Sequence, residues 1–188
     1  MNPSKKTTVG EPAWTYGKPA IFLHWLLAVL LSAMAALGWY MLSIEDQPGS
    51  GWYFDLHKSV GITVLVLVGL RLLWRLRHTP QRLPSSVPVW QARLSQSTQR
   101  LLYLCMFALP IAGLTGALYS KDGVALFGYA LPHPAPDHDL SEQLFSIHGA
   151  VVWVLVALVA LHAAGGLKHL LIDRDGVFQR MWPGSRNR

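Results

Sequence analysis

The sequence has few charged residues and almost no cysteine. Charged residues make up 14% of the 188 residues, whereas a soluble domain usually carries about 25%. Hydrophobic residues make up 52%, so the composition argues against a soluble domain and favours a membrane protein. The single cysteine, Cys105, excludes an internal disulfide, and there is no C-x-x-C-H motif for covalent haem attachment. The sequence also lacks an internal repeat, a glycine-rich phosphate loop and a nucleophile elbow.

Four apolar segments are each long enough to cross a bilayer. They lie at about residues 20–42, 57–76, 101–119 and 144–172. A span needs roughly 20 apolar residues, and the fourth segment is long enough to tilt or to project beyond the bilayer. The first segment resembles a signal peptide at its start, but its apolar run continues to Leu42. We therefore predict an all-α fold in which residues 1–188 form one integral membrane bundle of four transmembrane helices.

Positive charge is concentrated on one side of this predicted bundle. All but two of the 16 Lys and Arg residues fall in the N-terminal segment, the 77–100 loop, the C-terminal tail or the adjoining helix ends. The other side keeps only Lys58 and Lys121, but it holds seven of the ten acidic residues. The positive-inside rule then predicts that both termini are cytoplasmic. Because this asymmetry explains the net charge of +6, no nucleic-acid partner is needed to account for it.

Two of the segments that join the spans are long. The 77–100 segment is rich in Pro and Ser and then becomes basic and amphipathic, so we expect it to lie along the cytoplasmic surface. The 120–144 segment contains Pro132, Pro134 and Pro136, which favour extended or turn structure on the outer side.

Four of the eight histidines lie inside the spans or at their ends. His148 and His162 are 14 residues apart on the fourth span, which separates them by about 21 Å and puts them within about 40° on one helix face. On the other spans His24 matches the inner depth and His57 the outer depth. Ionisable residues within spans are costly and usually functional. The pairs His24–His162 and His57–His148 therefore suit planar groups between helices, the layout of two stacked bis-histidine haems.

Residues at related positions support this layout. Gly38 is 14 residues after His24 and leaves room for an outer macrocycle. Arg71 is 14 residues after His57, at the inner depth, where a haem propionate would pair with its charge. Gly113 and Gly116 thin the third span, although close helix packing explains these two glycines equally well.

Roles other than haem ligation fit the span histidines less well. A single histidine at a helix end is usually an interfacial hydrogen-bonding residue. A zinc site or an ion path would favour carboxylates within the spans, which the sequence lacks there. A catalytic acid–base set lacks a nearby carboxylate or nucleophile for the same reason. His78, His133 and His138 fall in loops and are expected to be surface residues.

Taken together, several stretches resemble the bacterial cytochrome b561 family. They are FLHWLLA, LHKSVGI, GLRLLWRLR, LPIAGL, IHGA and LHAAGGLKHLLIDRDGVFQRM, and they touch all four spans in order. The resemblance implies a multi-pass protein of the bacterial inner membrane with two b-type haems, whose iron ligands would be His24, His57, His148 and His162. The best-known activity of that family is superoxide oxidation, in which electrons pass to ubiquinone. Other related cytochromes are membrane subunits of larger oxidoreductases.

Two functions follow from the resemblance. In the first, the protein is an oxidoreductase that passes electrons between a periplasmic one-electron donor, for example superoxide, and the quinone pool of the respiratory chain. In the second, it is a membrane anchor and electron conduit for a separate periplasmic redox protein, which would dock on the acidic outer loops. A haem-free ion carrier is a third class. The sequence indicates no particular oligomeric state.

Two residues are candidates for roles in catalysis. His169 is seven residues after His162, near the same helix face and about 10 Å further toward the cytoplasm. Because histidine titrates near neutral pH, His169 is a candidate proton donor at a quinone site, together with Lys168 or Arg75. The alternative is an interfacial histidine beside snorkelling cations.

Lys58, the second candidate, directly follows His57, and Lys121 ends the third span. These two lysines would form a local positive spot that attracts the superoxide anion. The alternative for each is a solvated lysine or the partner of a haem propionate.

Overall fold

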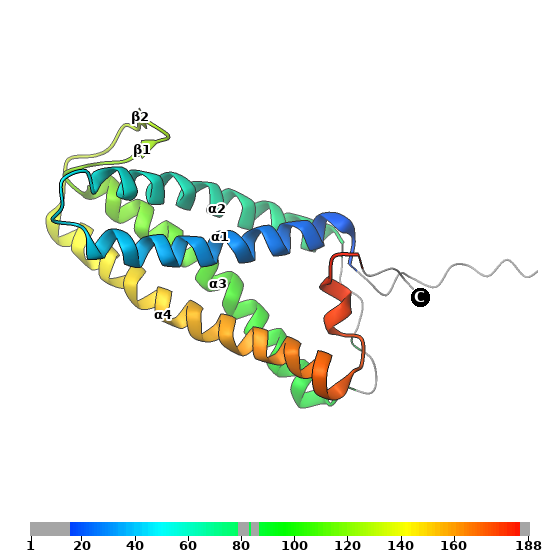
Figure 1. Ribbon diagram of the computed structural model, residues 1–188. Helices are drawn as coiled ribbons and strands as arrows, with labels where there is room; N and C mark the ends of the chain where they lie inside the picture. Colours follow the sequence, from blue (N-terminus) through cyan, green and yellow to red (C-terminus); the bar gives the residue numbers. More distant parts are fainter. Residues whose placement is uncertain (1–15, 79–82, 84–86, 185–188) are drawn as a thin grey trace, which may run out of the picture.

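Four long helices dominate the computed structural model, which describes residues 16–78, 83 and 87–184 (Figure 1). They are α1 (Lys18–Ser43), α2 (Gly51–Arg77), α3 (Val89–Tyr119) and α4 (His138–Lys168). In each of them an 18-residue stretch reaches a mean hydropathy of 1.8 or more, and each is long enough to cross a membrane. The predicted bundle of four transmembrane helices is therefore confirmed. Five of the 14 Lys and Arg residues on which the predicted orientation depends lie outside the described residues, in 1–15, 79–82 and 185–188.

The helices extend beyond the predicted spans into polar sequence. The structure begins α2 at residue 51 rather than 57, and α4 at residue 138 rather than 144. A cap explains the start of α4, because the Asp137 carboxylate accepts a hydrogen bond from the Leu140 N–H at 3.0 Å. Hydropathy marks only the part of a helix that lipid surrounds, whereas the cap marks where the helix begins.

The third helix differs most from expectation. α3 runs without a break from Val89 to Tyr119, so its basic first third continues the span and does not lie apart along the surface. Pro88 immediately precedes the helix, and a fixed proline φ suits a helix start. Within this part, the Gln99 side chain donates to the Ser95 hydroxyl at 3.1 Å, one helical turn away. Residues 79–82 and 84–86 of the same predicted segment lie outside the described residues.

The helices pack mainly in chain order, α1 on α2, α2 on α3 and α3 on α4. A small core of Leu27, Val64 and Val68 joins α1 and α2, and residues such as Tyr103 of α3 pack against it. Only 6% of the most apolar stretch is buried in α1 and in α4. A soluble bundle could not leave so much apolar surface in water, so the faces of these helices need lipid.

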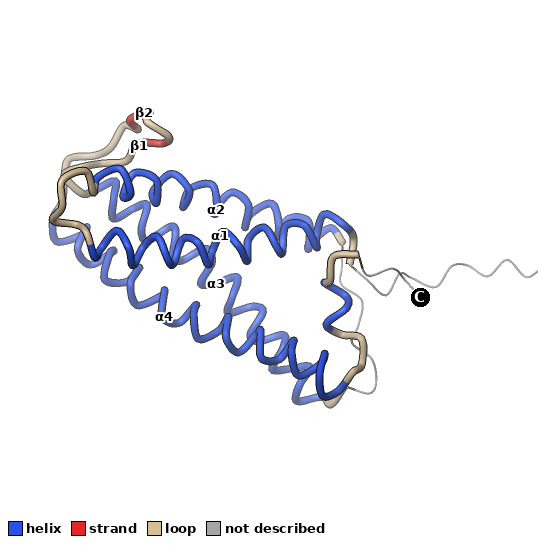
Figure 2. Tube along the Cα trace, viewed as in Figure 1, coloured by secondary structure: helices blue, strands red, loops and turns tan. Residues whose placement is uncertain are grey.

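Helix makes up most of the described chain, and the strands there are confined to one short hairpin (Figure 2). In this hairpin β1 (Ala125–Leu126) pairs antiparallel with β2 (Tyr129–Ala130). We call the end of the bundle that carries β1, β2 and the 44–50 turn the hairpin end. The prolines correctly predicted extended structure and turns in the 120–144 segment, but they did not predict the paired strands.

At the opposite end, which we call the terminal end, the chain folds back onto α1. After α4 it forms a short π-helix, η1 (His169–Asp173), and a 3-10 helix, η2 (Phe178–Met181). The Trp25 indole N–H donates to the Met181 carbonyl at 2.8 Å, and the rings of Trp25 and Trp182 are 5.7 Å apart. The C-terminal segment thus packs against the helix that carries His24.

Candidate functional site

The four histidines within the spans meet in two pairs, one toward each end of the bundle. The ring centroids of His57 and His148 are 6.2 Å apart, and those of His24 and His162 are 6.0 Å apart. A metal ion bound at about 2 Å by two facing imidazoles would separate the ring centroids by roughly 6 Å. The spacing of both pairs therefore fits one metal ion between two rings, and each pair links α4 to α1 or α2.

The ring of His148 is held by the third helix, which supplies no histidine of its own. Its Nδ1 is 2.9 Å from the Leu109 carbonyl. A carbonyl only accepts hydrogen bonds, so Nδ1 carries the proton and Nε2 of the neutral ring keeps a free lone pair. This is the usual arrangement of a metal-binding histidine, in which the second ring nitrogen donates to a backbone carbonyl.

Two glycines make room for the histidines at this end. A Cβ atom on Gly113 would lie 2.7 Å from His148 Nδ1, which is too close for the present ring position. A Cβ atom on Gly38 would lie 3.4 Å from His57 Cε1. The sequence left Gly113 open between thinning the third span and plain helix packing, and its contact with His148 favours a role at the site. Gly116 instead meets Phe145 and Leu144, as expected for helix packing.

The Nδ1 atom of His57 is buried and has no hydrogen-bond partner among the described residues. A buried polar atom normally has a hydrogen-bond partner. An unpartnered one in a candidate site therefore indicates a bound group or water that would supply the partner. Its ring pairs with His148 across the bundle.

At the terminal end Arg71 contacts His24. Its Nη1 donates to the Ala20 carbonyl at 3.0 Å, and its Nη2 lies 3.3 Å from His24 Nδ1. A guanidinium has no acceptor, so in this contact Nδ1 accepts and the proton of the neutral ring sits on Nε2. Metal binding through Nε2 would require Arg71 to leave Nδ1, and an anionic haem propionate is a suitable new partner.

The donor set at both pairs suits haem better than a free divalent ion. Each pair offers two imidazoles and no carboxylate, which matches the axial ligands of a b-type haem. In the described part of the chain, only His169, Asp173 and Asp175 bring three possible metal-ligand atoms within 4.8 Å of one another. The residues present at the two pairs therefore fit haem.

Comparison with known proteins identifies the family. The sequence profile of prokaryotic cytochrome b561 matches residues 15–184. The chain belongs to this family. Membership makes it a multi-pass bacterial membrane protein of electron transport, and it implies the binding of b-type haem.

The relatives of this cytochrome b561 match it over nearly their whole length. Cytochrome b561 homolog 2 of Escherichia coli (strain K12) is 33% identical over 174 residues, which cover 88% of this chain and 90% of the relative. Cytochrome b561 homolog 1 of the same organism is 28% identical, with coverage of 89% and 97%. A Yersinia pestis protein named "Probable superoxide oxidase CybB" is 29% identical, with coverage of 88% and 94%.

His169 lies in a polar cluster at the terminal end. Its Nδ1 is 2.7 Å from Asp175 Oδ2 and 3.4 Å from Asp173 Oδ2, and its side chain is 15% exposed. The Asp175 carboxylate also accepts a hydrogen bond from the Val177 N–H at 3.1 Å, and Lys168 forms an ion pair with Asp173. The sequence interpretation singled out His169 and Lys168 but missed both aspartates. The IDRDG stretch was the available signal, because a short acidic turn after a helix can reach back to its last residues.

A cavity of about 290 Å³ adjoins this cluster. Its lining residues come from the start of α3 and from the cluster itself, namely Val87, Pro88, Gln91, Asp173 and Asp175. Arg75, the other cation expected near a quinone, instead donates to the Gln99 side chain at 2.9 Å and lies over the Tyr103 ring. The geometry thus favours Lys168 over Arg75 as the cation beside His169.

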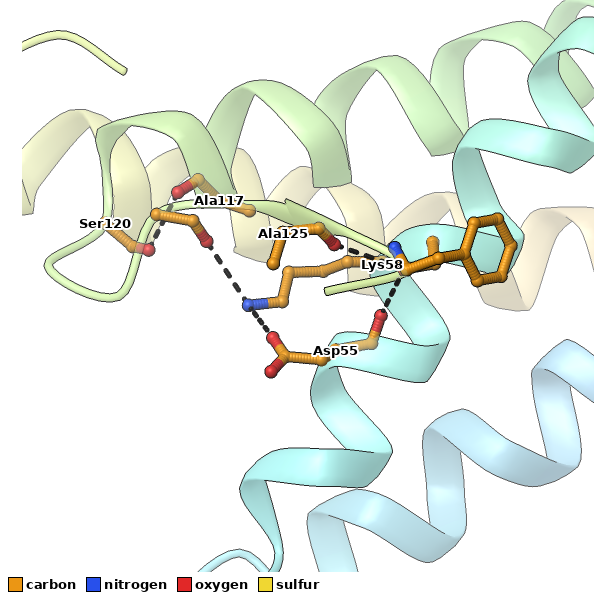
Figure 3. A network of polar contacts seen from close by, with 8 residues as sticks. Asp55, Lys58, Ala117, Ser120 and Ala125 are labelled. Atoms are coloured by element: carbon orange, nitrogen blue, oxygen red, sulfur yellow. Dashed lines mark hydrogen bonds and ion pairs between the residues drawn. The ribbon is translucent and has the colours of Figure 1, made fainter. Parts of the chain in front are cut away.

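Lys58 is engaged with its neighbours at the hairpin end. Its Nζ is 2.7 Å from Asp55 Oδ1 (Figure 3) and donates to the Gly123 carbonyl at 3.2 Å. The side chain of Lys58 is 19% exposed, whereas Lys121 is exposed in the turn after α3. Lys58 therefore links α2 to the segment that leads into the hairpin. This structural role is separate from any attraction of its charge for an anionic donor.

The three remaining histidines form local contacts. His78 stacks on Trp74 at the end of α2, His133 bonds to the adjacent Pro134 carbonyl, and His138 faces Glu142 within α4. All three are exposed, as expected for surface residues.

Proposed function

We propose that this cytochrome b561 carries two b-type haems and passes electrons between a periplasmic one-electron donor and the quinone pool. The observation that carries the proposal is the matched geometry of the pairs His57–His148 and His24–His162. Two sites of equal ring spacing, one toward each end of a membrane bundle, suit transfer across the bilayer. A single structural metal site would need only one of them.

A haem with two imidazole ligands supplies one-electron transfer and leaves no open position on its iron for oxygen. The chain's own residues would fix the ligands. The Leu109 carbonyl holds His148 in the tautomer that exposes Nε2, and Gly113 lets the ring approach α3. Gly38 leaves space beside His57, and Arg71 is placed to hold a propionate at the terminal end.

Superoxide is the donor that we favour, because the Yersinia pestis relative is named a probable superoxide oxidase. The positive-inside rule predicts that the hairpin end faces the periplasm, so the donor would arrive there. Lys58 and Lys121 lie at this end and would attract an anion. Since Asp55 pairs with Lys58, replacing both lysines with Gln should lower the superoxide-driven rate only a few-fold at most, by about the effect of a surface charge.

Ubiquinone is the acceptor that we favour, at the terminal end. Its reduction needs protons, and an imidazole such as that of His169 can donate one. The carboxylate of Asp175 holds Nδ1 of this ring and thereby orients the other nitrogen, which can deliver a proton. The adjoining cavity offers space for a head group next to this cluster.

The second candidate function is that of membrane anchor and electron conduit for a periplasmic redox protein. Exposed acidic residues at the hairpin end favour it, since they would suit a basic partner. They are Glu45, Asp46, Asp55, Asp122, Asp137, Asp139 and Glu142, of which Asp55 is paired with Lys58. In this case the haem arrangement is the same, and only the donor differs.

An absorption spectrum followed by a superoxide assay tests the proposal. Purified protein should show the bands of low-spin bis-histidine b haem with about two haems per chain. Superoxide added with ubiquinone should then yield ubiquinol without any other protein. Two haems without this reaction would favour the conduit function, and a protein that binds no haem would leave the ion carrier.

A further inference from the structure

The hairpin is apolar for a loop at the end of a membrane bundle. Residues 123–136, GVALFGYALPHPAP, contain no Asp, Glu, Lys or Arg. At its tip Phe127 is 63% exposed and Tyr129 is 81% exposed. Large aromatic side chains in water are unfavourable, whereas the interface of a bilayer is where aromatic residues are enriched.

The hairpin lies beside α2 and not beyond the end of the bundle. Figure 1 shows the two strands folded back along the first turns of α2, and β1 packs against that helix. The contact falls at Ser59, which follows the charged residues Asp55 and Lys58 and begins an uncharged stretch that ends at Leu70. This change of composition marks the depth at which α2 passes from the interface into hydrocarbon.

Part of the hairpin backbone is hydrogen-bonded within the protein, as a segment that faces lipid needs. β1 and β2 pair with each other, and one further hydrogen bond continues the pairing toward the base of the hairpin. Ser59 is 2% exposed, and its hydroxyl accepts from the Phe127 N–H at 3.0 Å. The same hydroxyl lies 2.8 Å from the Asp55 carbonyl and 3.1 Å from the Ala125 carbonyl, which both can accept its one proton. Water would satisfy such groups on an ordinary loop, but lipid cannot.

The tip also holds an unusual backbone conformation. Phe127 has a φ of +48°, in the left-handed region that side chains other than glycine rarely adopt. Phe127 and Gly128, with φ values of +48° and +91°, are the two central residues of the hairpin turn, which favours positive φ at both positions. The hydrogen bond from the Phe127 N–H to Ser59 joins this turn to α2.

We propose that the hairpin is an interfacial membrane anchor, in which Phe127 and Tyr129 insert among phospholipids beside α2 and Ser59 is the positioning residue that holds them. The charge-free sequence, the depth of the contact on α2 and the hydrogen bond from the Phe127 N–H to Ser59 carry this inference. The anchor would keep the segment that follows α3 beside the helix turn that carries His57.

Spin labels on the full-length protein in phosphatidylcholine vesicles test the anchor. In a Cys105→Ala background, single cysteines replace Phe127, Tyr129 or Gln47, the last being an exposed control in the 44–50 turn. Dissolved oxygen concentrates in lipid and a nickel chelate stays in water. The ratio of oxygen to nickel accessibility should be at least about fivefold higher at positions 127 and 129 than at position 47.

Adding Ser59→Ala should lower that ratio at positions 127 and 129 and leave it unchanged at position 47, because the Phe127 N–H loses its partner and seeks water. A ratio at 127 and 129 equal to that at 47 in the original protein would overturn the proposal. It would mean that the tip is in water, as a docking site for a soluble redox protein would be. Two labelled positions guard against a local disturbance at either one.

Discussion

The two histidine pairs have nearly the same ring spacing but different surroundings. At the hairpin end, the backbone of α3 holds His148 through the Leu109 carbonyl, and Gly113 fits beneath the ring. At the terminal end, the Arg71 guanidinium contacts His24. Neutral backbone groups therefore orient His148 at one end, and a positive charge lies beside His24 at the other.

This difference bears on the direction of electron flow. Reduction adds negative charge, so a nearby cation stabilises the reduced state and raises the midpoint potential. Arg71 would make the terminal-end haem the better acceptor. Electrons arriving at the hairpin end would then move downhill toward the end where His169 and Asp175 lie.

Replacing one histidine of a pair should abolish haem binding at that pair and leave haem binding at the other pair unchanged. His57→Ala or His24→Ala should each lower the haem content from about two to about one per chain, because a single imidazole holds a b-type haem weakly. Pyridine haemochrome assays against protein concentration measure this ratio.

The loop histidine variant His133→Ala, treated in the same way, should keep the full haem content, since its ring bonds only to the adjacent Pro134 carbonyl. If either span variant retained two low-spin haems, the assignment of that pair would be wrong.

Matched substitutions at Gly113 and Gly149 test whether Gly113 provides the space that the His148 ring occupies. A methyl group at Gly113 would collide with the His148 ring, whereas one at Gly149, next to His148 in sequence, meets no atom within 4 Å among the described residues. Gly113→Ala should therefore reduce haem content at the hairpin end partially, by less than His57→Ala does. Gly149→Ala should leave haem content and spectrum unchanged. If the two variants had the same haem content, Gly113 would not be what makes room for the His148 ring.

The sequence was sufficient to predict which histidines pair, but not which neighbouring residues hold their rings. A spacing of 14 residues places His148 and His162 on one helix face, since helix geometry alone determines that relation. That Gly113 faces His148 depends on how α3 and α4 pack, which periodicity does not determine. The spacing of 14 residues from His57 predicted Arg71 on the helix face and at the depth of the inner pair, but its contact with His24 depends on how α1 and α2 pack.

The ends of the chain segments were also hard to predict from sequence. Hydropathy found four spans but could not show that α3 continues through the basic sequence at Arg93 and Arg100. Pairing of Asp175 with His169 depends on the turn after η1 and on a left-handed Arg174, which no pattern indicated. Family membership accounts for the presence of the resembling stretches together in one sequence, whereas the contacts show which neighbours their side chains meet.

At the terminal end, the aspartates around His169 offer a graded test of proton delivery. His169→Ala should lower quinone reduction by about 100-fold with both haems retained, the usual loss when a general acid is removed. Asp175→Asn should lower the rate about tenfold, because this carboxylate orients the ring of His169. Stopped-flow reoxidation of the reduced protein by ubiquinone measures both rates.

Asp173→Asn is the control in this series. Asp173 lies further from His169 Nδ1 than Asp175 does, and its closer partner is Lys168. The rate should therefore fall less than with Asp175→Asn. Normal quinone reduction in His169→Ala would remove this residue from the proposed site.

Replacing Arg71 tests the difference between the two ends most directly, although its effect on activity should be the smallest. Arg71→Gln should lower the midpoint potential of one haem by roughly 50–100 mV and leave the other unchanged, because the charge lies near the terminal-end pair alone. Redox titration followed by absorbance resolves the two steps. The exposed Arg93→Gln removes the same charge from α3 and should shift neither potential, since solvent screens it. Equal shifts of both haems with Arg71→Gln would mean that Arg71 acts through the overall charge of the protein and does not set the direction of electron flow.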